Sequence, residues 1–310
     1  GFVFNSQEVH VSASIGIATF PQDGSDPITI LRCADSAMYK AKESGKNNFQ
    51  YSSQELNTHS LQRLALESSL QHALSRKELH LVYQPIINTK DQRILGVEAL
   101  MRWDHPDMGS ISPLQFIPLA EENGIIEEIG HWVLETACRQ ARKWLGKPLS
   151  LSVNVSARQL QRSNFLKELK SVLDKTGFPP PALVLDITES IIMINPDHAS
   201  EVLHGIRDLG VKIALDDFGT GYSSLSNLKK FPIDILKIDR SFLQSVPEDV
   251  ENTALTSAII ALGEKLNLLV VAEGVENEAQ KLFLEAQNCP QSQGFLFHIP
   301  LEPEEITKLL

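Results

Sequence analysis

The chain has 310 residues, 42% of them hydrophobic, so it is long and apolar enough to bury a substantial core, and global disorder is excluded. Its formal net charge of −11 argues against polymeric nucleic acid as a partner, because nucleic acids are bound mainly through clustered cations. No apolar run approaches the roughly 18 residues that span a bilayer, and Cys33, Cys138 and Cys289 lack disulfide or zinc spacing, so we expect no direct membrane contact and a reducing, cytoplasmic setting.

Residues 1–51 form a small α+β unit of their own. The alternating stretch 9–20 predicts a strand or hairpin arm, residues 28–43 carry apolar side chains at helical spacing, and residues 48–51 predict a last short strand. The polar residues 52–60 then predict a linker to a second domain over 61–310.

Four stretches of this first unit match a known family. They are residues 11–18 (VSASIGIA), 21–24 (PQDG), 34–42 (ADSAMYKAK) and 45–47 (GKN). Together they resemble the C-terminal part of a GGDEF (diguanylate cyclase) domain. The turn that names this family would lie upstream and is absent, so we expect no cyclase activity from these residues. The chain starts at Gly1 without a methionine, which indicates that GGDEF or sensory segments precede it and leaves room for a membrane anchor in the full-length protein.

From residue 61 onward, short apolar runs alternate with helical stretches. A first helix is expected at 61–77, and strand candidates lie at 79–87, 94–100, 149–155, 183–187, 211–215, 233–238, 268–272 and 294–297. Further helices are expected at 125–145, 165–176, 197–209, 253–266, 276–287 and 303–309. Eight strands separated mostly by helices predict a (β/α)8 TIM-like barrel. A doubly wound sheet is the alternative, which the lack of a phosphate-binding fingerprint after the first strand disfavours.

The stretch 211–221 (VKIALDDFGTG) carries the strongest sign of chemistry. Its apolar run predicts a buried parallel strand that ends at two adjacent acids, Asp216 and Asp217, before a glycine-rich turn. Two carboxylates at one strand end repel each other, and burying one unpaired costs several kcal/mol, so a divalent cation is expected beside them. The alternative is that one of the acids only caps the next helix.

Polar side chains also follow most of the other predicted strands. In a barrel the carboxyl ends of the strands meet on one face, where catalytic residues gather. The residues at these ends are Glu98, Asn154, Asp186 with Glu189, Asp216, Asp217, Lys237, Asp239 and Glu273. Each alone has an alternative role as a cap or turn residue, but together the acids would repel strongly without cations. Carboxylate and amide oxygens suit Mg²⁺ or Mn²⁺ rather than zinc, and two such ions about 3.5–4 Å apart form a clamp for phosphodiester hydrolysis.

Motifs along residues 61–310 match a second family. They are EALMRW at 98–103, YQPI at 83–86, NVS at 154–156, DDFGTGYSSL at 216–225, LKID at 236–239, AEGVE at 272–276 and QGFLF at 293–297. This domain therefore resembles the EAL domain, the family of cyclic di-GMP phosphodiesterases. The resemblance implies a barrel with an antiparallel first strand, and metal-dependent hydrolysis of cyclic di-GMP to linear pGpG in bacterial second-messenger signalling. Because the family often dimerises, a second copy of this chain is an expected partner.

The same resemblance implies roles for individual residues. Metal ligation, of two Mg²⁺ or Mn²⁺ ions with Asp216 bridging, is implied for Glu98, Asn154, Asp186, Asp216, Asp217 and Glu273. Lys237 would hold the attacking water or the phosphate charge, and Glu273 would help to deprotonate that water, so these two residues and Glu98 are the implied catalytic set. Substrate contacts are implied for Gln84, Leu100, Arg102, Asp239 and Gln293. A regulatory loop, anchored by Glu189, would contain Phe218, Gly219, Thr220 and Gly221.

The fourth strand departs from the family pattern. Residues 186–189 are Asp-Ile-Thr-Glu, whereas the family usually begins this motif with glutamate, a metal ligand. The shorter side chain withdraws the Asp186 carboxylate by roughly 1.3–1.5 Å, about one carbon–carbon bond, whereas metal sites tolerate shifts of about 0.2 Å unless a water compensates. Hydrolysis is the leading hypothesis. The alternative is a catalytically weak or inactive EAL domain that serves as a cyclic di-GMP receptor, and a purely structural barrel should have lost several acids.

Overall fold

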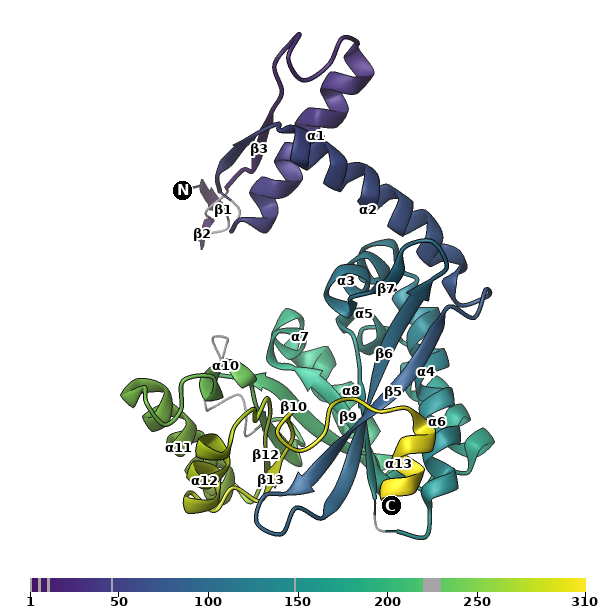
Figure 1. Cartoon of the computed structure of the whole chain (residues 1–310), viewed down its shortest axis with the longest axis vertical. Helices are drawn as coiled ribbons and strands as arrows, with labels where there is room; N and C mark the ends of the chain where they lie inside the picture. Colours follow the sequence, from purple (N-terminus) through teal and green to yellow (C-terminus); the bar gives the residue numbers. More distant parts are fainter. Residues whose placement is uncertain (1, 5–6, 10–11, 46, 148, 220–229) are drawn as a thin grey trace. The chain divides into compact units, whose positions relative to one another are not determined.

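The computed structural model of this chain describes residues 2–4, 7–9, 12–45, 47–147, 149–219 and 230–310 (Figure 1). Internal contacts separate two compact units, residues 1–72 and 73–310. Across the described ranges, none of the helices combines the length and the apolar character that a bilayer crossing would require.

The first unit contains short strands and helices. Its elements are β1 (Phe2–Phe4), β2 (Gln7–Val9), β3 (Ile15–Ile17), α1 (Pro27–Glu43), β4 (Phe49–Tyr51) and α2 (Gln54–Ala73). Strands β3 and β4 pair in parallel, and α1 connects them. Helix α1 begins after Asp26, whose carboxylate accepts a hydrogen bond from the Thr29 amide and so satisfies a free donor of the first turn. β3 packs so closely on α1 that a Cβ at Gly16 would lie 1.8 Å from the Ala34 carbonyl oxygen.

Two element boundaries in this unit differ from the prediction. Within the predicted arm 9–20, strand β3 covers only Ile15–Ile17. Helix α2 begins at Gln54 instead of residue 61, so it covers most of the predicted linker. Residues 54–60 are mostly polar, but they contain neither glycine nor proline, so nothing in them interrupts a helix. The division into domains 1–51 and 61–310 stays a prediction.

Eight strands of the second unit close into a barrel. They are β5 (Leu79–Asn88), β6 (Ile94–His105), β8 (Ser150–Asn154), β9 (Leu183–Thr188), β10 (Lys212–Phe218), β11 (Ile235–Ile238), β12 (Leu269–Ala272) and β13 (Gln291–Ser292). They pair in the order β5-β13-β12-β11-β10-β9-β8-β6, the β5–β6 pair closes the ring, and β7 (Gly109–Ile111) extends β6 as a hairpin. β5 is antiparallel to both neighbours and the other barrel pairs are parallel. The predicted barrel and its antiparallel first strand are therefore confirmed.

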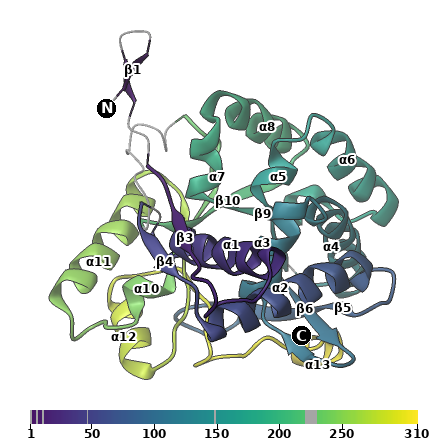
Figure 2. The ribbon, with the colours of Figure 1, turned by 90° about the horizontal axis from the view of Figure 1, so that it is seen from above.

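Helices surround these strands, as Figure 2 shows from above. They are α3 (Pro113–Asn123), α4 (Ile126–Ala141), η1 (Arg142–Trp144), α5 (Ala157–Leu160), α6 (Phe165–Thr176), η2 (Pro180–Ala182), α7 (Glu189–Ile194), α8 (Pro196–Asp208), α10 (Arg240–Leu243), α11 (Val250–Lys265), α12 (Glu278–Ala286) and α13 (Pro303–Leu309). Helix α6 has the predicted bounds because its signals are local. Phe165, Leu169, Val172 and Leu173 form its buried face, and Gly177 ends it with a φ of 62°.

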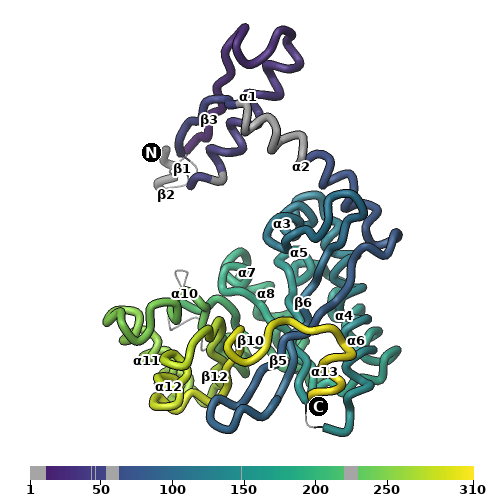
Figure 3. Tube along the Cα trace, viewed as in Figure 1, coloured from purple at the N-terminus to yellow at the C-terminus, as the bar shows by residue number. Residues whose placement is uncertain are grey.

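The last barrel strand lies before its predicted position. Residues 294–297, predicted as a strand, form a turn in which the amides of Phe297 and His298 donate to the Gly294 carbonyl. The actual strand, β13, consists of Gln291–Ser292, two polar residues that carry no apolar signal. Farther along, Leu301 and Tyr83 exchange both backbone hydrogen bonds at 2.8 Å, so the C-terminal segment crosses β5 (Figure 3).

An apolar layer fills the barrel beneath the carboxyl ends of the parallel strands. This apolar layer is one buried cluster of Ile86, Val184, Ala214, Ile235 and Val271, whose exposed fractions are 1–8%. Because side chains alternate along a strand, residues two positions away face the same side of the sheet. The residues two positions from this layer, toward the carboxyl ends of the parallel strands, are Gln84, Asp186, Asp216, Lys237 and Glu273. We call these five, with Glu98 and Gln293, the polar layer.

Candidate active site

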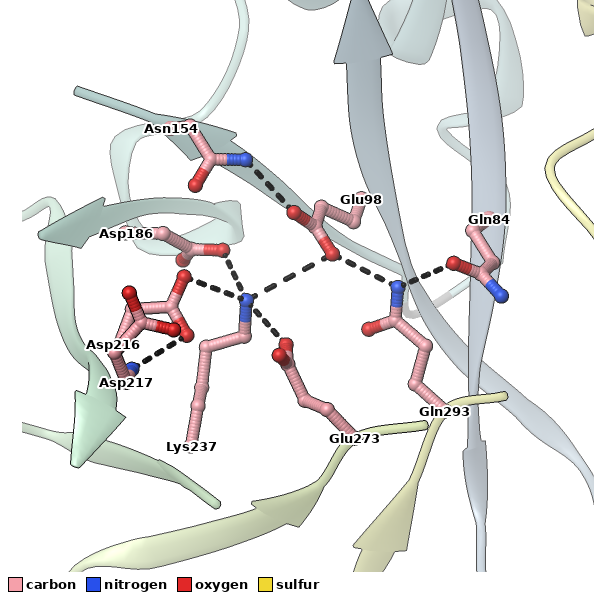
Figure 4. Close-up of polar contacts among 9 residues, drawn as sticks. All are labelled: Gln84, Glu98, Asn154, Asp186, Asp216, Asp217, Lys237, Glu273 and Gln293. Atoms are coloured by element: carbon pink, nitrogen blue, oxygen red, sulfur yellow. Dashed lines mark hydrogen bonds and ion pairs between the residues drawn. The ribbon is translucent and has the colours of Figure 1, made fainter. Parts of the chain in front are cut away.

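A buried lysine lies among four carboxylates of the polar layer (Figure 4). Lys237 is 1% exposed, and its Nζ lies 2.6 Å from Glu273 Oε1 and 2.8 Å from Asp186 Oδ2. Asp216 Oδ2 and Glu98 Oε2 lie 3.6 and 3.7 Å from the same nitrogen. These acids come from β6, β9, β10 and the residue after β12, so the barrel brings together predicted site residues that are far apart in the sequence.

The charges of this cluster depend on one another. Burial by itself would lower the pKa of Lys237, but the neighbouring carboxylates, led by Asp186, hold that pKa well above its usual value, so the amine stays protonated. Burial raises the pKa of Asp186 to about 7, with Lys237 opposing the shift and the charges of Glu98 and Asp216 adding to it. One ammonium cannot neutralise four carboxylates, so the cluster favours the uptake of further cations or protons.

Strand β10 delivers two consecutive acids through a bulge. It continues to Phe218, past its predicted end at residue 215, and its pairing with β11 shifts between Leu215 and Phe218. Adjacent residues of a regular strand point to opposite faces. Asp217 has a φ of 55°, which lies outside the strand region, so the regular alternation is interrupted at this residue. Its amide donates a hydrogen bond to Asp216 Oδ1 over 2.9 Å. Burial, followed by the charges of Asp216 and Asp239, raises the pKa of Asp217.

Side-chain amides hold Glu98 on both sides (Figure 4). Asn154 Nδ2 donates to Glu98 Oε1 over 2.7 Å, and Gln293 Nε2 donates to Glu98 Oε2 over 2.8 Å. Gln293 Nε2 also donates to Gln84 Oε1, and Gln84 Nε2 donates to the His298 carbonyl, both over 3.0 Å. The His298 carbonyl is a part of the site that sequence reasoning missed, because a backbone group leaves no signal in residue type.

Three predicted substrate contacts lie outside this hydrogen-bond cluster. Asp239 is the N-cap of α10 and accepts a hydrogen bond from the Ser241 amide over 3.0 Å. Arg102 donates to the carbonyl of the preceding residue over 2.8 Å, and burial lowers the pKa of its guanidinium. Leu100 is half-buried on β6. Contact of these residues with substrate stays a prediction.

Glu189, the residue predicted to anchor the regulatory loop, contacts the first part of that loop. Glu189 is 4% exposed, and its Oε2 accepts a hydrogen bond from the Gly219 amide over 3.4 Å. Gly219 has a φ of 95°, and a Cβ there would lie 3.0 Å from the Phe242 ring, so a larger residue would be strained. Phe218 is buried at the end of β10. Thr220 and Gly221 lie outside the described residues.

The donor chemistry of the polar layer fits a divalent metal ion. Its oxygen ligands are those that Mg²⁺ and Mn²⁺ prefer. Asp186 Oδ1 is buried without a hydrogen-bond partner among the described residues, and a cation would satisfy this acceptor. As the side chains of the described ranges stand, no three or more acids, histidines or cysteines are placed to hold a metal. Lys237 Nζ lies where the carboxylates converge, so a metal would share them with this lysine.

Comparisons with known proteins match the two parts of the chain to two domain families. A family model described as the EAL domain matches residues 67–300, and one described as the diguanylate cyclase GGDEF domain matches residues 2–48. The chain is 42% identical over 308 residues to the bifunctional diguanylate cyclase/cyclic di-GMP phosphodiesterase MucR of Pseudomonas aeruginosa, with 98% of this chain and 45% of that protein covered. It is 41% identical over 296 residues to the cyclic di-GMP phosphodiesterase PdeR of Escherichia coli, with 95% and 45% covered.

A solved relative shares the barrel. The structure described as the PaMucR phosphodiesterase in complex with c-di-GMP is 44% identical, has a TM-score of 0.76, and covers 78% of this chain and 99% of that one. The chain spans less than half the length of the two curated relatives. These matches confirm both resemblances that the motifs indicated.

Proposed function

Because the chain belongs to the EAL domain family, we propose that it hydrolyses one phosphodiester bond of cyclic di-GMP to give linear pGpG in bacterial signalling. The observation that supports this most strongly is the convergence of four carboxylates on one buried lysine at the carboxyl ends of the barrel strands. A family member with 41% identity is named a cyclic di-GMP phosphodiesterase, and a solved one is a complex with this dinucleotide.

The proposed cofactors are two Mg²⁺ or Mn²⁺ ions. EAL phosphodiesterases in general depend on divalent metal ions, and the oxygen-rich polar layer suits such ions. The proposed ligands are Glu98, Asn154, Asp186, Asp216, Asp217 and Glu273. Bound there, the ions would lower the pKa of a coordinated water and shield the phosphate charge.

The protein's own side chains would bind the substrate and move the proton. Glu273 Oε1 lies 2.6 Å from Lys237 Nζ, which favours the ionised carboxylate, while burial raises the pKa of this carboxyl well above its usual value; in its ionised form Glu273 is therefore a stronger base for the proton of the attacking water. Lys237 stays protonated, so its Nζ can hold negative charge that develops on the phosphate. Arg102 would hold a phosphate oxygen, and Leu100 would contact the nucleotide.

Control of this site by a second copy of the chain is also part of the proposal. The loop that begins at Gly219 is held at its first amide by Glu189, close in sequence to the Asp216–Asp217 pair. A shift of that loop would therefore move metal ligands. The homodimer and the cytoplasmic setting expected from the sequence stay predictions.

A cyclic di-GMP receptor without turnover is the second candidate, and Asp186 is the observation that favours it. Its side chain is 0% exposed, and its Oδ2 lies 2.8 Å from Lys237 Nζ. The short side chain is therefore engaged by the lysine, and a metal site that needs this carboxylate would be weakened. Binding of the dinucleotide through the remaining residues would not require that metal site.

The deciding measurement is cyclic di-GMP hydrolysis by the purified chain with Mg²⁺ and with Mn²⁺, beside cyclic di-GMP affinity in Ca²⁺. We expect linear pGpG as the product, and loss of its formation in Glu98→Ala with the fold retained. Glu248→Ala, at an exposed acid outside the polar layer, is the matched control and should keep parent activity. Tight binding without product, with turnover gained in Asp186→Glu, would establish the receptor instead. An unchanged rate in Glu98→Ala would refute the site assignment.

A further inference from the structure

A line of hydrogen bonds runs from the backbone into the polar layer through two buried glutamines. The His298 carbonyl accepts from Gln84 Nε2, and Gln84 Oε1 accepts from Gln293 Nε2, both over 3.0 Å. The other hydrogen of Gln293 Nε2 goes to Glu98 Oε2 over 2.8 Å. Gln84 is 7% and Gln293 4% exposed, so water does not compete freely for these bonds.

We call this line of hydrogen bonds, from the His298 carbonyl through Gln84 and Gln293 to Glu98, the relay. The donor-to-acceptor direction of its hydrogen bonds follows from the two groups at its ends. The His298 carbonyl can only accept a hydrogen bond, so Gln84 must turn its NH₂ group toward it and its Oε1 toward Gln293. Gln293 therefore must present its NH₂ group to Gln84 Oε1, and the carboxylate of Glu98, another pure acceptor, requires the same orientation. Neither amide can be reversed without placing two acceptors against each other.

This orientation leaves one acceptor directed away from the relay. Gln293 Oε1 is buried and has no hydrogen-bond partner among the described residues. In Figure 4 it lies on the side of the Glu273 carboxylate. Leaving a buried acceptor unsatisfied is destabilising, so this position favours a donor that enters the site. A donor beside Gln293 Oε1 and Glu273 would face two acceptors, and water, with two hydrogens, can satisfy both.

We propose that Gln84 is a positioning residue that acts through Gln293, and that Gln293 Oε1 accepts a hydrogen bond from the water that attacks the phosphodiester. This role rests on the proposed hydrolysis of cyclic di-GMP. Glu98 also orients Gln293, but its carboxylate is a proposed metal ligand. Gln84 is then the partner that keeps the Gln293 amide in place when Glu98 binds a metal. Direct contact of Gln84 with substrate, which the motif implies, leads to a different result in a double-mutant cycle.

The test compares Gln84→Met, Gln293→Met and the double variant in steady-state hydrolysis of cyclic di-GMP with Mn²⁺. We expect Gln84→Met to lower kcat roughly tenfold with KM within about twofold, because the attacking water is less well held. In the Gln293→Met background the same change should lower kcat by less than about twofold, since the residue through which Gln84 acts is gone. Multiplicative losses in the double variant, or a loss confined to KM, would overturn the relay.

A second readout does not depend on turnover. In the full chain labelled with ¹⁵N-glutamine and kept in EDTA, the side-chain amide protons of Gln293 should exchange slowly with solvent. Gln84→Met should accelerate that exchange by severalfold, and an unchanged exchange rate would overturn the relay. If the parent chain forms no pGpG, the proposed hydrolysis and the role given to the water fail, while the exchange rates still decide whether Gln84 positions Gln293.

Gln280→Met is the matched control for the loss of a buried amide. Gln280 is 2% exposed, and its Nε2 donates to the Leu243 carbonyl over 2.8 Å, outside the polar layer. Its substitution should lower thermal stability without the kcat effect and without changing exchange at Gln293. A fall in kcat equal to that of Gln84→Met would reduce the role of Gln84 to structural support and so overturn the proposal.

Discussion

The apolar and polar layers of the barrel use the same strands for opposite purposes. Ile235 and Lys237 are two residues apart on β11, as are Val184 and Asp186 on β9, so each pair faces the same side of the sheet. The apolar member of each pair lies in a cluster with exposed fractions of 1–8%. The polar member of each pair, Lys237 or Asp186, is about as deeply buried as its apolar neighbour, but it lies among charged groups. A step of two residues thus separates a layer that stabilises the barrel from a layer that we propose carries its chemistry.

The two layers should therefore respond differently to substitution. Each large side chain of the apolar layer stabilises the fold by about 1.5–3 kcal/mol through burial. The acids of the polar layer are desolvated and share one ammonium, so removing one of them relieves repulsion as well as breaking contacts. Activity should be sensitive in the polar layer and stability in the apolar layer.

The largest effect is expected from Asp216→Asn in the polar layer. Asparagine can still accept from the Asp217 amide, but it lacks the charge that a metal and Lys237 Nζ require. We expect kcat for cyclic di-GMP hydrolysis to fall roughly 10³-fold or more, about 4 kcal/mol in the barrier, while the free energy of unfolding changes by less than about 1 kcal/mol. Parallel kinetics and urea unfolding measure both quantities. A large loss of stability in this variant would erase the distinction between the layers.

The matching change in the apolar layer is Ile235→Ala, two residues before Lys237. Ile235 is 8% exposed, so its truncation leaves a cavity and should lower the free energy of unfolding by about 2–4 kcal/mol. The folded fraction should keep kcat within about threefold of the parent, because no ligand or charge changes. Urea unfolding and kinetics at a temperature where the variant stays folded give the comparison. A loss of kcat as large as that of Asp216→Asn would show that the layers are coupled.

The smallest effect concerns pH in EDTA. Burial raises the pKa of Asp186 from an ordinary value of 3.8 to about 7. Between these pH values the unfolded chain releases the proton while the folded chain keeps it, so this group makes the fold less stable as pH rises. The Tm of the parent, taken relative to that of Asp186→Asn, should fall by a few degrees from pH 4 to pH 7 in EDTA and recover at pH 7 when EDTA is replaced by excess Mn²⁺. A difference in Tm that rises with pH would contradict this.

Local patterns predicted much of the second unit. Helix α6 has the predicted bounds, and seven of the eight barrel strands overlap their predicted positions, because apolar runs and helical spacing are properties of consecutive residues. The predicted position of the last strand was wrong, because Gln291–Ser292 forms a strand only through its pairing with β12 and β5. The bulge at Asp217 could not be predicted from local patterns either, because it depends on the register between β10 and β11.

The sequence by itself determined the family, the alternation of strands and helices, and the identity of the acids, the lysine and the amides at the strand ends. Only the tertiary structure decided which of them meet: that four acids face Lys237 Nζ, and that Gln84, Gln293 and the His298 carbonyl form one relay. The physical reason is distance along the chain. Side-chain period and propensity act over a few residues, whereas these contacts join residues as many as 214 positions apart, and barrel closure sets their register.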